Sequence, residues 1–166
     1  MRNSSTMRVH RLPSVLLLML LPLSAAGQSA LDVAQKANLM GTWATSCATP
    51  IIPANSRAIY YAAPNGQLRR KIDRGAGYPP LDGVVEYIEM INATTVRLRF
   101  RTDSSSWGRA NGIRMEVVMQ NLSNCHCMRI LSANAQDGSI FIMDGHLTEN
   151  GEPAPLLEKC ADPSKP

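Results

Sequence analysis

The sequence predicts an all-β fold, an antiparallel up-and-down β-barrel of about eight strands with a short N-terminal helix. Three observations carry this prediction. Short segments with alternating apolar and polar residues recur at even spacing, hairpin-length connections join them, and helical periodicity is nearly absent. An antiparallel series of this kind closes best as a barrel, because closure removes exposed strand edges. The predicted strands cover 41–47, 57–63, 67–74, 84–91, 95–101, 113–120, 125–133, 139–144 and 156–160.

The chain divides into three predicted parts. Residues 1–27 have a basic start, an unbroken apolar run and small residues before a cleavage point, as secretory signal peptides do. Residues 28–160 form the single barrel domain, and 161–166 form a disordered tail. The apolar run is too short to span a bilayer, and no second run has spanning length. We therefore expect a periplasmic or secreted protein without a membrane span.

Charge argues against a nucleic-acid partner. The chain has 17 Lys and Arg against 13 Asp and Glu, but three of the arginines lie in the predicted signal, which has no acid. The remainder carries 14 basic and 13 acidic groups, a balance close to neutral. No sequence feature indicates a cofactor, and we expect a monomer.

The first elements are the helix and the first strand. Apolar residues at Leu31, Ala34 and Ala37 have helical spacing and end before Gly41, which predicts one or two turns across an end of the barrel. The first strand, 41–47, carries Trp43, a large amphipathic ring suited to plugging the barrel.

The next strands form consecutive hairpins. In 57–63, Ile59 and Tyr61 are assigned to one face and Tyr60 to the other, and an Asn-Gly turn follows. In 67–74, Leu68 and Ile72 are predicted to point inward. Residues 75–83 are read as a loop, and 84–91 as a strand covered on both faces, because apolar residues occupy both of its faces.

The strand 95–101 has the clearest pattern. Its apolar residues alternate strictly with Arg97, Arg99 and Arg101, so one face should be a row of guanidinium groups. This row is either a basic patch for an anionic partner or a solvated outer face. In the second case its charges would meet glutamates, and Glu86, Glu89 and Glu116 are available to it on the flanking strands.

Four cysteines in an exported chain of this size indicate disulfides. Three pairings are possible, and we favour Cys47 with Cys160, which would fasten the first strand to the last, leaving Cys125 with Cys127. On a regular strand the last two would be about 6.6 Å apart at Cα, near the upper limit for a disulfide. A redox pair, or a metal site that also uses His146, therefore stays open as an alternative at Cys125 and Cys127.

The helix, the Gly41-Thr42-Trp43 stretch after a signal peptide and the run of hairpins resemble the lipocalins and the wider calycin group. The resemblance implies a cup-shaped cavity for a small apolar ligand. It also implies an arginine covering the buried tryptophan, for which this chain offers several candidates.

The expected function is therefore non-catalytic binding of a small apolar molecule, without a metal. The alternative is a protein-interaction module, for instance an inhibitor of a cell-envelope enzyme, that uses loops around Pro79 and Trp107. The residues predicted to line the lumen are Trp43, Tyr61, Leu98, Phe100 and Met115.

Overall fold

The computed structural model describes residues 28–104 and 112–161. The predicted signal peptide, most of the tail and Trp107 lie outside these residues. One helix and ten strands are present in the described ranges: α1 (Ala30–Lys36), β1 (Gly41–Ala44), β2 (Arg57–Ala62), β3 (Leu68–Asp73), β4 (Leu81–Met90), β5 (Thr95–Ser104), β6 (Arg114–Leu122), β7 (Cys127–Ala135), β8 (Ile140–Met143), β9 (His146–Leu147) and β10 (Leu156–Lys159).

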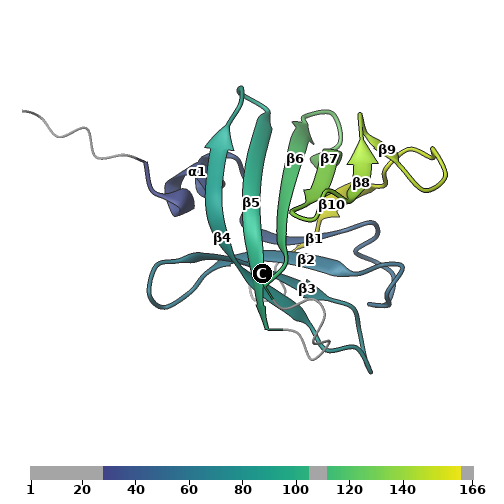
Figure 1. Ribbon diagram of the computed structural model, residues 1–166, viewed down its shortest axis with the longest axis horizontal. Helices are drawn as coiled ribbons and strands as arrows, with labels where there is room; N and C mark the ends of the chain where they lie inside the picture. Colours follow the sequence, from purple (N-terminus) through teal and green to yellow (C-terminus); the bar gives the residue numbers. More distant parts are fainter. Residues whose placement is uncertain (1–27, 105–111, 162–166) are drawn as a thin grey trace, which may run out of the picture.

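The strands form one antiparallel sheet that closes on itself (Figure 1). The order runs β10-β1-β2-β3-β4-β5-β6-β7, and β10 pairs with β7 as well as with β1, so these eight strands make a ring. This confirms the predicted barrel. β10 pairs with the first half of β7, from Cys127 to Arg129, whereas β8 pairs with its second half, at Ala133 and Asn134. The hairpin β8–β9 therefore extends the sheet outside the ring.

Helix α1 begins at a capping box. The Ser29 hydroxyl accepts a hydrogen bond from the amide of Asp32, whose carboxylate accepts one from the amide of Ser29. The helix lies beside β4 (Figure 1) and packs on β4 and β3. Its buried residues are Val33 and Ala34. Since it has seven residues, this packing rather than helix propensity holds it. In the described part of the chain, no helix is long and apolar enough to cross a membrane.

The segment after α1 closes one end of the barrel. The Trp43 indole donates a hydrogen bond of 2.7 Å to the Leu39 carbonyl, and the Asn121 amide at the end of β6 donates one of 2.6 Å to the Ala37 carbonyl. Lys159 on β10 donates to the Asn38 carbonyl and side chain. We call this side the closed end, and the opposite side, where β5 ends and β6 begins, the open end.

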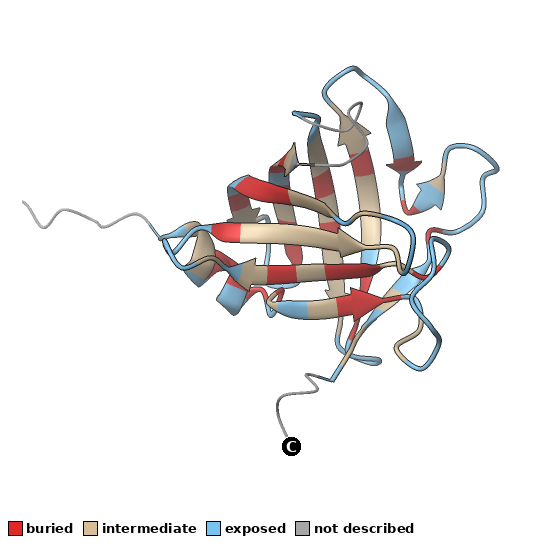
Figure 2. Cartoon of the chain, turned by 90° about the horizontal axis from the view of Figure 1, so that it is seen from below, coloured by how far each residue is buried: buried red, intermediate tan, exposed pale blue. Residues whose placement is uncertain are grey.

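Two strand predictions need correction. β4 begins at Leu81, inside the predicted loop 75–83. It is also not covered on both faces, because Glu86 and Tyr87 are exposed. A bulge between Val85 and Tyr87 places Glu86 and Tyr87 outward and breaks the simple alternation, so Val85 and Ile88, which differ in parity, both reach the single interior. Figure 2 shows that the buried residues lie mainly on the strands and the exposed ones mainly in the loops.

Candidate functional site

Strand register defines which residues face the barrel interior. Near the closed end, Met90, Val96 and Met119 lie in one row across neighbouring strands, and Ile88, Leu98 and Val117 lie in the next. Most of these side chains are buried, and all six belong to the core that also includes Trp43, Leu39 and Met128. This half of the interior is filled by its own side chains.

The open half is lined differently. Small residues face inward at Ala58, Gly83, Ala133 and Ala135. Around them several inward-facing side chains are only partly buried. These are Arg70, Ile72, Leu81 and Met115. Small residues fill less of the interior than the large side chains of the closed half do, and partial burial means that solvent reaches these inward side chains.

Arg70 is the charged residue of the open half. It lies between Tyr60 on β2 and Gly83 on β4, and its guanidinium carbon is 4.2 Å from the centroid of the Phe100 ring. Its Nε is buried and has no hydrogen-bond partner. A guanidinium can stack on an aromatic face in this way, but stacking leaves its N–H donors available.

Four of the five residues predicted to line the lumen face inward. Trp43, Leu98 and Phe100 are buried in the core, and Met115 lies beside Phe100 nearer the open end. The ring of Trp43 is covered by Lys159, whose Nζ is 5.4 Å from the ring centroid. A lysine thus occupies the position for which the resemblance implied an arginine.

The placement of Tyr61 in the lumen is wrong. Ala58 pairs with the inward Trp43, so alternation along β2 turns Tyr60 inward and Tyr61 outward. Tyr60 is buried, with its hydroxyl 3.8 Å from the Met119 sulfur. The Tyr61 hydroxyl instead donates a 2.8 Å hydrogen bond to Asp82 on the outer face.

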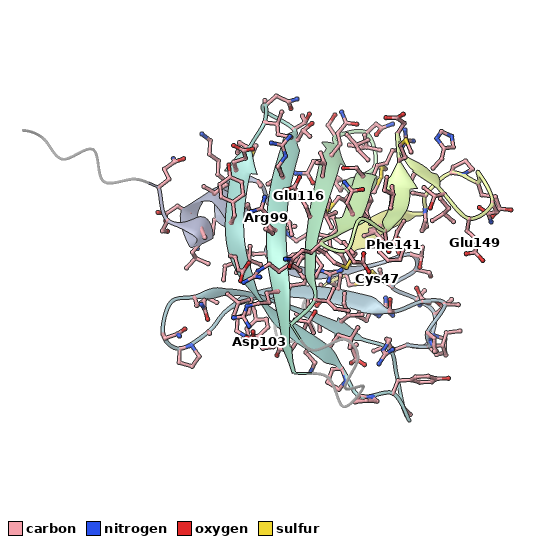
Figure 3. The ribbon with its side chains drawn as sticks, viewed as in Figure 1. Cys47, Arg99, Asp103, Glu116, Phe141 and Glu149 are labelled. Carbon is pink, nitrogen blue, oxygen red and sulfur yellow. A yellow bond between two sulfur atoms is a disulfide. The ribbon has the colours of Figure 1, made fainter. Side chains whose placement is uncertain are left out.

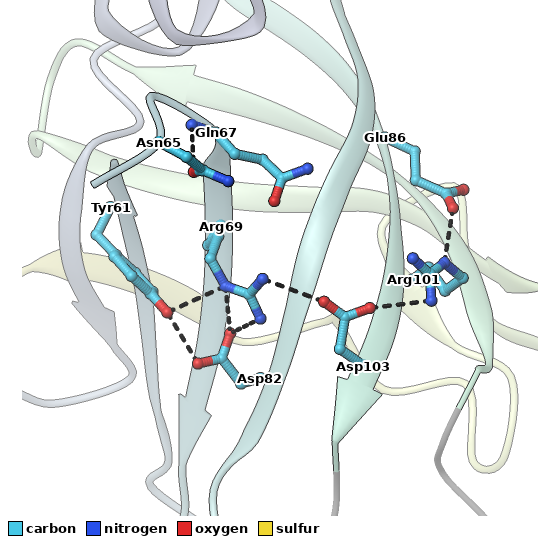
Figure 4. Close-up of polar contacts among 8 residues, drawn as sticks. All are labelled: Tyr61, Asn65, Gln67, Arg69, Asp82, Glu86, Arg101 and Asp103. Atoms are coloured by element: carbon cyan, nitrogen blue, oxygen red, sulfur yellow. Dashed lines mark hydrogen bonds and ion pairs between the residues drawn. The ribbon is translucent and has the colours of Figure 1, made fainter. Parts of the chain in front are cut away.

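The arginine row on β5 faces outward and is matched by acids. Arg97 contacts Glu89 at 2.9 Å. Arg99 contacts Glu116 at the same distance, and both are labelled in Figure 3. Glu86 accepts from Arg101 (Figure 4) and from Arg114, each at 2.9 Å. Contacts with Arg114 and then Arg101 lower the pKa of Glu86. Because each arginine of the row has a carboxylate partner, the face carries little net charge, which disfavours the anionic-partner interpretation.

On the outer face the ion pairs continue to β3, and hydrogen bonds of Tyr61 extend the network to β2 (Figure 4). Arg69 contacts Asp82 at 2.9 Å and Asp103 at 3.1 Å, and Asp103 in turn contacts Arg101 at 3.0 Å. Partial burial and the hydrogen bond to Asp82 raise the pKa of the Tyr61 hydroxyl. This cluster joins β2, β3, β4 and β5 on the outer face. Asp82 and Asp103, the acids nearest to Arg70 in register, are paired with Arg69 within it.

Other surface features lie away from the interior. A shallow pocket of about 360 Å³ lies beside the open end, between Arg99, Arg114 and Gln136. On β8, Ile140, Phe141 and Met143 are exposed although apolar. Phe141 is labelled in Figure 3. In the predicted loop around Pro79, the neighbouring Tyr78 is also exposed.

The cysteines pair as favoured, Cys47 with Cys160 and Cys125 with Cys127. The second pair does not lie on a regular strand, because β7 begins only at Cys127. His126 between them has a φ of 50°, and this turn brings the two Cα atoms to 5.1 Å rather than the extended spacing. Across the described residues no group of three His, Cys, Asp or Glu side chains is placed to bind a metal.

Sequence reasoning assigned no role to Arg70 and Tyr60. The signal for Arg70 was present, because Leu68 and Ile72 were predicted to face inward and Arg70 lies between them at the same parity. No such signal separated the two tyrosines of β2, since aromatic residues occupy both parities there.

Comparison of the chain with protein-family models, with curated proteins and with solved structures finds no match.

Proposed function

We propose that this protein is a non-catalytic barrel that binds a small, largely apolar molecule in the open half of its interior. The observation that carries the proposal is the contrast between the two halves. The closed half holds large, fully buried side chains such as Trp43, Leu39 and Met119, whereas the open half is lined by small residues and by partly buried inward ones. A lipocalin-like mode of binding, with the ligand entering a cup from one end, agrees with this arrangement.

Export to the periplasm or the extracellular space belongs to the same proposal. Two disulfides support it, since such bonds persist in oxidising compartments, and the predicted signal peptide agrees.

Binding of Nile red, a neutral apolar dye, tests the proposal. We expect saturable binding to the wild-type protein. Ala135→Phe, which fills the open half, should weaken binding by about tenfold, the cost of losing roughly 1.4 kcal/mol of contact. Asn134→Phe, the next residue on β7 and on its outer face, is the matched control and should bind as the wild type does. Absence of binding, or equal binding by both variants, would contradict an interior site.

A protein-interaction module is the second candidate. It is favoured by β8, where three of four side chains are exposed apolar groups outside the barrel ring. Cross-linking from a photoreactive residue at position 141, in the exported compartment, would test it. A discrete cross-linked partner that is lost when Met143 is changed to serine would support this function, and absence of any cross-link would argue against it.

A further inference from the structure

Within residues 28–104 and 112–161, the interior of the barrel holds a cation without a counter-charge. Arg70 faces inward from β3, stacks on Phe100, and has a buried Nε without a hydrogen-bond partner. None of the inward-facing residues on the described parts of the eight ring strands is acidic. The acids closest in sequence and register, Asp82 and Asp103, lie on the outer face and contact Arg69. An unpaired interior guanidinium is costly to bury, so its presence needs a reason.

The second inward cation shows what a satisfied site looks like in this barrel. Lys159 covers Trp43 at the closed end, and its ammonium group donates to the Asn38 carbonyl at 3.1 Å and to its side-chain oxygen at 2.6 Å. Arg70 has no comparable acceptor among the described residues. Both cations are partly buried, so the difference between them is that Lys159 has protein acceptors and that the buried Nε of Arg70 has none.

The residue beside Arg70 on β4 has no side chain. It is Gly83, and a Cβ at that position would lie 2.4 Å from the Arg101 carbonyl oxygen. Glycine is therefore required there, because a side chain would collide with the backbone of β5. Thr102, paired with Gly83 on the next strand, adds an inward hydroxyl to the same row.

We infer that Arg70 binds the anionic head group of an amphiphile whose apolar tail occupies the open half of the barrel. The inference rests on the proposed binding function and specifies its ligand class. The guanidinium offers charge-assisted hydrogen bonds to a carboxylate or a similar oxyanion, and the partly buried Ile72 and Met115 offer apolar contact to the tail.

Three amphiphiles with the same decyl chain test the inference by isothermal titration calorimetry. They are decanoate, the neutral 1-decanol and the cationic decyltrimethylammonium. At neutral pH, we expect decanoate to bind about tenfold or more tightly than decanol, as one charge-assisted hydrogen bond provides, and the cation to bind weakest. The comparison uses the wild-type protein, so it does not depend on whether a variant folds.

Two variants locate the effect. Arg70→Gln should weaken decanoate binding by about tenfold and leave decanol binding unchanged. Lys71→Gln removes the same charge from the neighbouring, outward position of β3 and should change neither. Equal binding of decanoate and decanol by the wild type, or an unchanged preference in Arg70→Gln, would overturn the role of Arg70 while leaving the binding barrel intact. Binding of none of the three would instead overturn the proposed function.

Discussion

The disulfide between Cys47 and Cys160 should contribute far more stability than the one between Cys125 and Cys127. The first joins residues 113 apart in the chain, and the second joins residues two apart. A cross-link stabilises mainly by restricting the unfolded chain, and more so for a longer loop. The chain-entropy relation gives about 4.8 kcal/mol for the loop of 113 residues and about 1 kcal/mol for that of two.

The perturbation is the double variant Cys47→Ala, Cys160→Ala, with Cys125→Ala, Cys127→Ala as its matched control. The first should still fold, because β1 and β10 remain paired through Trp43 and Lys159. Urea unfolding followed by tryptophan fluorescence measures both. With an m-value of about 2 kcal/mol/M, the midpoint of the first should fall by about 2 M and that of the control by about 0.5 M.

The comparison between the two variants decides the outcome. Both lose two cysteines, and both keep one disulfide, so they differ chiefly in the length of the loop that is opened. Equal losses of stability would refute the loop-entropy reasoning. They would show that local packing around the sulfur atoms, rather than restriction of the unfolded chain, sets the contribution of each bridge.

Three further predictions concern the barrel wall and its closed end. Gly83→Ala should lower the free energy of unfolding by about 2 kcal/mol or more in urea titration, because the new Cβ meets the Arg101 carbonyl; an unchanged midpoint would contradict that contact. Trp43→Phe should cost about 1 to 3 kcal/mol by thermal unfolding, since the buried Leu39 carbonyl loses its donor, and a loss no larger than that of a surface substitution would contradict this. The pKa of Glu86 is lower in the folded protein than its ordinary value of 4.5, so its stabilising contribution is complete above that pH and is lost as the pH falls through the folded-state pKa. Glu86→Gln should therefore flatten the acid limb of the stability profile, whereas Glu149→Gln should leave it unchanged; identical limbs in both would contradict the role of the ion pairs.

Features that depend on local spacing or on covalent chemistry were predictable. Strict alternation from Val96 to Arg101 identified both faces of β5, because successive side chains on a strand point to opposite sides. The glutamates opposite the arginines followed from the same alternation. The cysteine pairing followed from the number of cysteines and from the benefit of joining the chain ends. These inferences need no knowledge of which distant segments meet.

Features that depend on long-range pairing were not predictable from local spacing. Tyr60 and Tyr61 are equally suited to the interior, and the pairing of Ala58 with Trp43 selects Tyr60. The strand predicted at 139–144 has the pattern of a barrel strand. Because β10 pairs with the first half of β7 and closes the ring there, β8 pairs with the second half and lies outside the ring. Arg70 has the parity of an inward residue, but its lack of a counter-charge emerges only when all eight strands close around it. Alternation assigns a side chain to a face; which face becomes the interior, and what else shares it, depends on contacts between residues far apart in the chain.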